Sequence, residues 1–152
     1  MKRKGNKNIW IVLFIILIGG LLFINASGLF DEKIKIPNSE KEIIDNCKNL
    51  DLENSVDCLV KNVKKFYKYN YTNGIGDILD FNELKNNGGD CRDWAFLYER
   101  LGKGLGLTST SYGLDRNGNG KSDHRFAIIS NGSYCIIDQT TYWCKELKNG
   151  EE

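Results

Sequence analysis

The stretch GGDCRDW, residues 88–94, is the part of this chain that best indicates its fold and chemistry. Two glycines precede Cys91 and apolar residues at helical spacing follow it, so we expect Cys91 where a loop enters a helix. A thiol at that position lies at the positive end of the helix dipole, which favours its thiolate form. Asp90 and Asp93 are carboxylates of the kind that stabilise a helix N-terminus. The sequence therefore predicts a reactive thiol at a helix start.

Two residues further along the chain could complete a catalytic set with this thiol. His124, the only histidine, opens the apolar run 126–129, and Asp138 closes the apolar run 134–137. If these runs are neighbouring strands, Cys91, His124 and Asp138 can converge on one point as nucleophile, base and orienting group. Taken singly, each also has a structural interpretation: a small buried thiol, a structural histidine and a turn-forming aspartate. Together and in this order, they favour a Cys-His-Asp triad.

These motifs resemble those of the transglutaminase-like superfamily, over about residues 55–145. The resemblance implies a papain-like core and assigns the catalytic triad to Cys91, His124 and Asp138. It also implies a protein or peptide substrate and thiol-dependent acyl transfer or hydrolysis at amide bonds, by a transglutaminase-like enzyme, a cysteine protease or another amidase. Relatives in this superfamily include inactive members, so the fold alone does not fix the reaction.

The implied mechanism gives each residue a role. Cys91 attacks an amide carbonyl and forms a thioester, while His124 activates the thiol and protonates the leaving amine. Asp138 accepts a hydrogen bond from the imidazole and fixes its tautomer. We expect the backbone N–H of Cys91 to be one donor of the oxyanion hole, because helix N-terminal amides lack partners. The chain departs from the family at Arg125, often an aromatic residue, and at Gln139, often proline.

The N-terminus has the pattern of a targeting segment. Four basic residues precede an apolar run over residues 9–24, with no acidic residue within or before it. This predicts a membrane anchor or signal segment in residues 1–27, a linker over 28–40 and the transglutaminase-like domain over 41–152. The basic flank should stay in the cytoplasm. We expect a single-pass cell-membrane protein whose C-terminal domain is extracytoplasmic, or a secreted domain if the segment is cleaved.

The five cysteines support this placement. Cys47 and Cys58 flank a short turn between helical segments, and Cys135 and Cys144 flank a strand and its return. Outside the cytoplasm such pairs are expected to form disulfides, which leaves Cys91 as a free thiol. Five cysteines permit other pairings as well. A zinc site is a weaker alternative, because the chain has no CxxC motif and only one histidine.

The hydrophobic pattern predicts an α+β fold, in which N-terminal helices pack on a small antiparallel sheet. A helix start is expected at Asn38-Ser39-Glu40, a second near Asn54-Ser55 and a third at Cys91. Asn131-Gly132 has the composition of a hairpin turn. Three or four strands are expected to follow, at 107–114, 125–130, 133–138 and 142–147.

The loop between the first two of these strands could bind a metal. It resembles the first half of an EF-hand loop, but Phe126 occupies the twelfth position, where such loops carry a glutamate. The candidate calcium ligands are Asp115, Asn117, Asn119 and Asp123. The same composition is ordinary for a long turn, so both interpretations stand. The triad chemistry itself requires no cofactor.

Three classes of function follow from these features. The first is the thiol enzyme, acting on a protein or peptide and attached to the membrane through residues 9–24. The alternative is a catalytically inactive transglutaminase-like binding module at the cell surface, since a domain this small has little chain left for substrate walls. A third is a calcium-dependent adhesion or surface-structure protein centred on the 115–123 loop. The formal net charge of +1 and the absence of a basic stripe give no case for nucleic acid.

Overall fold

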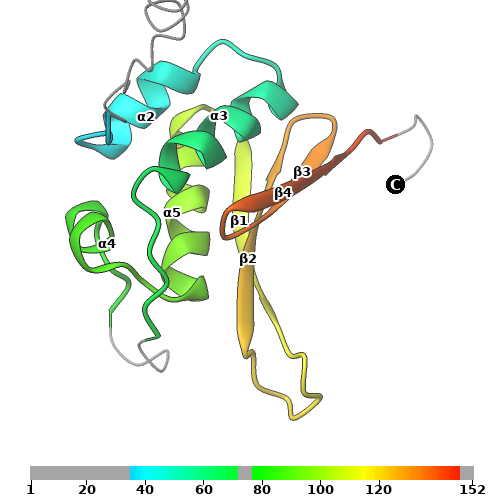
Figure 1. Cartoon of the computed structure of the whole chain (residues 1–152). Helices are drawn as coiled ribbons and strands as arrows, with labels where there is room; N and C mark the ends of the chain where they lie inside the picture. The colour runs from blue at the N-terminus through cyan, green and yellow to red at the C-terminus, as the bar shows by residue number, and fades with distance from the viewer. Residues whose placement is uncertain (1–34, 72–76, 148–152) are drawn as a thin grey trace, which may run out of the picture. The chain divides into compact units, whose positions relative to one another are not determined.

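A computed structural model describes residues 35–71 and 77–147 of the chain (Figure 1). The chain divides into two units, residues 1–35 and 36–152, and every element below belongs to the second. Within the described residues, four helices precede a four-stranded antiparallel sheet, which confirms the predicted α+β class. The helices are α2 (Glu40–Cys47), α3 (Leu52–Lys64), α4 (Phe81–Asn87) and α5 (Cys91–Gly104), and the strands are β1 (Thr108–Leu114), β2 (His124–Ser130), β3 (Tyr134–Asp138) and β4 (Thr141–Lys145).

Side-chain oxygens cap the helices at their starts. Ser39 accepts a hydrogen bond from the N–H of Glu42, which confirms the predicted start of α2. The predicted start of α3 is two residues late. Asp51 accepts from the N–H of Asn54 at 2.9 Å, so the helix begins at Leu52.

Helix α4 is an element that the sequence analysis did not predict. Asp80 accepts from the N–H of Glu83, and the Glu83 carboxylate accepts from the N–H of Asp80, each at 2.9 Å. This reciprocal capping box satisfies two backbone donors of the first turn. Phe81 and Leu84 then lie in the core. The spacing of Asp80 and Glu83 in the sequence is typical of a capping box and indicates the start of this short helix.

The strands follow one another across the sheet in chain order, each antiparallel to the next. Their bounds lie within one or two residues of the predicted ones. The predicted Asn131-Gly132 turn joins β2 to β3, with a φ of 73° at Gly132 and a hydrogen bond from the Asn131 N–H to the Ser133 carbonyl. In Figure 1 the loop between β1 and β2 projects beyond the rest of the sheet.

The core lies between the helices, α5 in particular, and one face of the sheet. Alternate residues of the two central strands are buried there: Ala127 and Ile129 from β2, and Cys135 and Ile137 from β3. Trp94, one turn into α5, is fully buried, and its ring lies 4.7 Å from that of Tyr67. The N-terminus of α5 therefore rests on a packed aromatic layer, which limits its movement.

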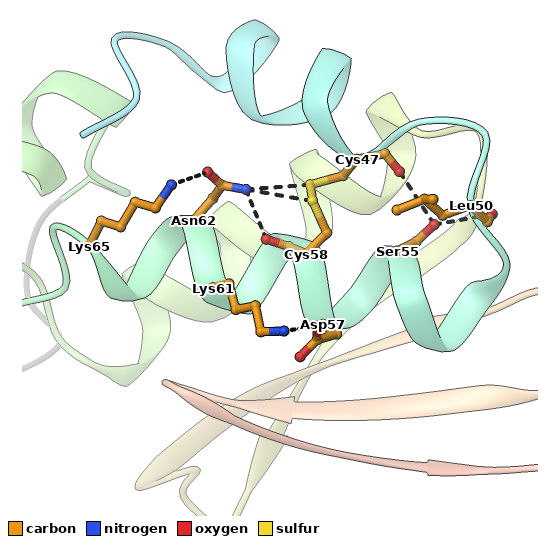
Figure 2. Close-up of a disulfide and its surroundings, with 8 residues drawn as sticks. All are labelled: Cys47, Leu50, Ser55, Asp57, Cys58, Lys61, Asn62 and Lys65. Atoms are coloured by element: carbon orange, nitrogen blue, oxygen red, sulfur yellow. Dashed lines mark hydrogen bonds and ion pairs between the residues drawn. A yellow bond between two sulfur atoms is a disulfide. The ribbon is translucent and has the colours of Figure 1, made fainter. Parts of the chain in front are cut away.

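Both predicted disulfides are present. Cys47–Cys58 joins the end of α2 to α3, and the side-chain amide of Asn62 lies 3.6 Å from each of its sulfur atoms (Figure 2). Cys135–Cys144 joins directly opposed residues of β3 and β4. All five cysteines lie in the described part of the chain, and Cys91 is the one outside a disulfide. Two disulfides are consistent with an oxidising, extracytoplasmic environment.

In the ranges 35–71 and 77–147, no helix is long and apolar enough to cross a membrane. The predicted anchor over residues 9–24 lies outside the described residues.

Candidate active site

The loop before Cys91 is held by backbone pairing with a distant segment. The N–H of Gly89 donates to the carbonyl of Lys68 at 3.1 Å, and the N–H of Asn70 donates to the carbonyl of Gly89 at 2.9 Å. Gly88 has a φ of 77°, and a Cβ there would lie 2.5 Å from the Lys68 carbonyl oxygen. Glycine is therefore required at position 88, both by the backbone conformation and by the close approach of the second chain.

Two buried carboxylates fix the start of α5. Asp90 Oδ1 accepts from the N–H groups of Arg92 at 2.9 Å and Asp93 at 3.3 Å. Asp93 Oδ2 accepts from the N–H of Asp90 at 3.1 Å, which completes a capping box around Cys91. Burial raises the pKa of Asp93, and hydrogen bonds from the N–H groups of Asp90 and Leu79 offset this only in part. Cys91 thus starts a helix whose first turn is held on both sides.

The amide of Cys91 differs from its neighbours. Asp90 takes the N–H groups of Arg92 and Asp93, whereas the N–H of Cys91 has no acceptor in the described part of the chain. An unpaired amide at the positive end of a helix is suited to an anionic oxygen. Its position supports the expected role as one donor of an oxyanion hole.

His124 and Asp138 contact each other directly. His124 is the first residue of β2 and Asp138 is the last of β3, so the antiparallel pairing brings them to the same end of the sheet. The distance from His124 Nε2 to Asp138 Oδ2 is 2.9 Å. A carboxylate only accepts, so Nε2–H is the donor of this bond, and in the neutral imidazole Nδ1 then keeps a lone pair. The imidazole side chain is 12 % exposed and the carboxylate side chain 47 %.

Cys91 and His124 line one hollow of about 340 Å³. Tyr69 and Tyr71 contribute to its wall, and so does Arg125, whose guanidinium also lies 5.0 Å from the ring centre of Phe96. No hydrogen bond joins the Cys91 sulfur to His124 among the described residues. Such contacts are often long in a free enzyme and tighten with substrate. His124 and Asp138 are therefore linked by a hydrogen bond, whereas Cys91 and His124 only line the same hollow.

A larger hollow, of about 820 Å³, lies between the N-terminus of α3 and β4. Its walls include Asp51, Asp57 and the Cys135–Cys144 disulfide, but neither Cys91 nor His124. We place the candidate site in the smaller hollow, because only that one brings a free thiol and an imidazole together.

Tyrosines near the site were not singled out from the sequence. Tyr67 lies beyond the end of α3 at Lys64, and its hydroxyl donates to Gln139. Tyr98 is buried on α5 and donates to the carbonyl of Gln139 at 2.7 Å. No local pattern could indicate these bonds, since each joins residues more than 40 positions apart.

The candidate calcium ligands lie in the loop between β1 and β2. Asp115 accepts hydrogen bonds from the N–H groups of Asn117, Asn119 and Gly120. Asp123 accepts from Arg116 and from the side-chain amide of Asn117. Both carboxylates therefore bind donors of their own loop. No cluster of three or more acidic, histidine or cysteine side chains suited to a metal occurs in the described ranges. Calcium binding stays a prediction.

In comparisons with known proteins, no family model, no curated protein and no solved structure matches this chain.

Proposed function

We propose that this chain is a transglutaminase-like thiol enzyme, with a papain-like core, that transfers or hydrolyses acyl groups at amide bonds of a protein or peptide. One observation carries the proposal: His124, which is hydrogen-bonded to Asp138, lines the same hollow as Cys91, the one free thiol, at the start of α5. Nucleophile, base and orienting group are the set that this chemistry requires.

The first half of the reaction forms a thioester. The Cys91 thiol gives its proton to His124 Nδ1, and the sulfur attacks the carbonyl carbon of the amide. The N–H of Cys91 donates to the resulting oxyanion. His124 then returns the proton to the amine as the C–N bond breaks, so the amine leaves and the acyl group stays on sulfur. Asp138 stabilises the imidazolium that exists between these two proton transfers.

The second half decides the class of enzyme. Water attacking the thioester gives a carboxylic acid and makes the protein a hydrolase, whereas a primary amine gives a new amide and makes it a crosslinking enzyme. In either case, His124 Nδ1 takes the proton of the attacking group and returns it to the Cys91 sulfur. We propose that this occurs outside the cytoplasm, on a membrane-anchored chain, which the two disulfides support.

The first test is chemical and needs no substrate. Because Cys91 is the one cysteine outside a disulfide, iodoacetamide reports it alone in the purified, unreduced full-length chain. We expect rapid alkylation that persists at acidic pH and is slowed at least tenfold by His124→Ala. Slow alkylation that His124→Ala leaves unchanged would reject the triad.

The second test separates the reactions. Casein offered with dansylcadaverine reports crosslinking by incorporated fluorescence, and ammonia or peptide release without incorporation reports hydrolysis. Cys91→Ala is the control for both assays. Reactive Cys91 with no turnover of any amide donor would favour the inactive binding module instead.

A further inference from the structure

The turn between β3 and β4 has an unusual backbone. Asp138 pairs with Thr141, so the turn consists of Gln139 and Thr140 alone. Gln139 has a φ of 56°, in the left-handed region that residues with a Cβ adopt at a cost. Such a conformation persists only where surrounding contacts determine it, and it is frequent at functional sites. The contacts of Gln139 are therefore informative.

Two tyrosine hydroxyls hold this residue. Tyr67, in the segment after α3, donates to Gln139 Oε1 at 2.5 Å. Tyr98, fully buried on α5, donates to the backbone carbonyl of Gln139 at 2.7 Å. One bond fixes the side chain and the other fixes the backbone, and both come from elements outside the sheet. We call Tyr67, Tyr98 and Gln139 the tyrosine clamp.

The clamp connects both parts of the candidate site: the loop before Cys91, through Trp94, and the turn after Asp138. The ring of Tyr67 packs on Trp94, whose indole N–H donates to the carbonyl of Gly89, two residues before Cys91. Burial, together with the nearby Tyr69, Asp138 and Cys91, raises the pKa of Tyr67 to about 12. Its hydroxyl therefore stays protonated, and remains a donor, at any pH at which the protein works.

Asp138 by itself is weakly held. Its Oδ2 binds His124, while its Oδ1 is buried without a hydrogen-bond partner among the described residues. A carboxylate with one protein bond depends on its backbone for direction. That backbone leads directly into Gln139, so the clamp sets where Asp138 points.

We propose that Gln139, held by Tyr67 and Tyr98, is a positioning residue that aims Asp138 at His124 and so fixes which imidazole nitrogen carries the proton. The inference deepens the proposed function and rests on it for its catalytic meaning. The two tyrosine bonds also account for glutamine at a turn position that requires a positive φ, because they offset the cost of that conformation.

The experiment reads the imidazole directly. With a single histidine, the chain gives one pair of imidazole ¹⁵N signals, so the tautomer of His124 can be read without assignment. Tyr67→Phe removes one hydroxyl, and Gln139→Met removes its acceptor at similar length. The matched control is Tyr142→Phe, which removes a hydroxyl bond from the same hairpin to Asp57 on α3, away from the turn.

In the wild-type chain we expect the neutral imidazole to carry its proton on Nε2. Tyr67→Phe and Gln139→Met should each give a mixture of tautomers and slow Cys91 alkylation about fivefold, the effect of one lost hydrogen bond. The double variant should be no slower than either single one, because both remove the same bond. Tyr142→Phe should change neither readout.

Gln139→Gly is a control that separates loss of the hydrogen bond from loss of folding. Glycine adopts a positive φ freely, so this variant should melt near the wild-type temperature and still lose the Nε2 preference. A wild-type tautomer and alkylation rate in all three single clamp variants would overturn the inference. This result would leave the proposed function intact if His124→Ala still slows alkylation. A shifted tautomer, with alkylation that does not depend on His124, would support the positioning and reject the proposed function.

Discussion

Replacing Asp138 by asparagine is the most direct perturbation of the candidate site. The substitution keeps the size of the side chain and an oxygen that can accept from His124 Nε2, but it removes the charge and replaces the second carboxylate oxygen by an NH₂ donor. The 2.9 Å bond between these groups is charge-assisted when the imidazole is protonated, and such bonds are about twice as strong as neutral ones. The expected change is therefore a weaker bond with the geometry retained.

The size of the effect follows from burial. A hydrogen bond to a charged group contributes about 1.5–3 kcal/mol. The Asp138 side chain is 47 % exposed, so solvent screens part of its charge and the lower end of this range applies. A loss of about 1.4 kcal/mol is a tenfold change in rate. We expect Asp138→Asn to slow alkylation of Cys91 by iodoacetamide about tenfold at pH 6, measured by mass spectrometry over time.

Two further variants make the measurement decisive. Asp57→Asn makes the same change of net charge on α3, outside the hollow of Cys91, and should alkylate at the wild-type rate. The double variant His124→Ala, Asp138→Asn should be no slower than His124→Ala, because the carboxylate acts only through the imidazole. Asp138→Asn within twofold of Asp57→Asn would refute this account of the site, since the bond would then have no influence on the thiol.

Three predictions concern the scaffold that holds the site. Replacing both Cys47 and Cys58 by alanine should lower the free energy of unfolding in urea by about 3 kcal/mol, which is the loop-closure value for their separation of 11 residues. An unchanged midpoint of urea unfolding would contradict this prediction. Gly88→Ala should cost about 2 kcal/mol or more and slow Cys91 alkylation, because its Cβ would strike Lys68 and its φ is positive; wild-type values for both would show that the loop adapts. Burial raises the pKa of Asp93, so the folded state binds more protons between the ordinary value of 3.8 and the raised one, and stability from this group falls as pH rises through that window. Asp93→Asn should flatten the pH dependence of urea unfolding there, and an unaltered slope would be evidence against a shifted carboxyl.

Much of the fold could be predicted because its signals are local. Helix starts are marked by capping residues such as Ser39, and the β2–β3 turn by Asn131-Gly132. The disulfide partners lie 11 and 9 residues apart, within reach of any local pairing. Hydrophobic spacing does not indicate the short helix α4, whose signal in the sequence is the Asp80–Glu83 capping box.

The same distinction between local and long-range signals applies to the candidate site. That His124 and Asp138 would meet could be predicted, because antiparallel strands joined by a short turn place the start of one beside the end of the next. The tyrosine clamp could not, because Tyr67 and Gln139 are 72 residues apart and only the packing of a helical layer on the sheet brings them together. Composition showed that tyrosines were frequent, but not that two of them would hold one turn.

The first turn of α5 bears on the choice between an enzyme and a binding module. A scaffold that only binds would need Cys91 only as a small residue. Here the Asp90 carboxylate accepts from the N–H groups of Arg92 and Asp93, and the N–H of Cys91 stays open beside the free sulfur. In the same hollow, His124 has its Nε2 held by Asp138, so that Nδ1 is the nitrogen left for a proton. An open amide, a free thiol and an oriented base contribute little to stability, but each is needed to break an amide bond. The arrangement therefore favours turnover over binding alone.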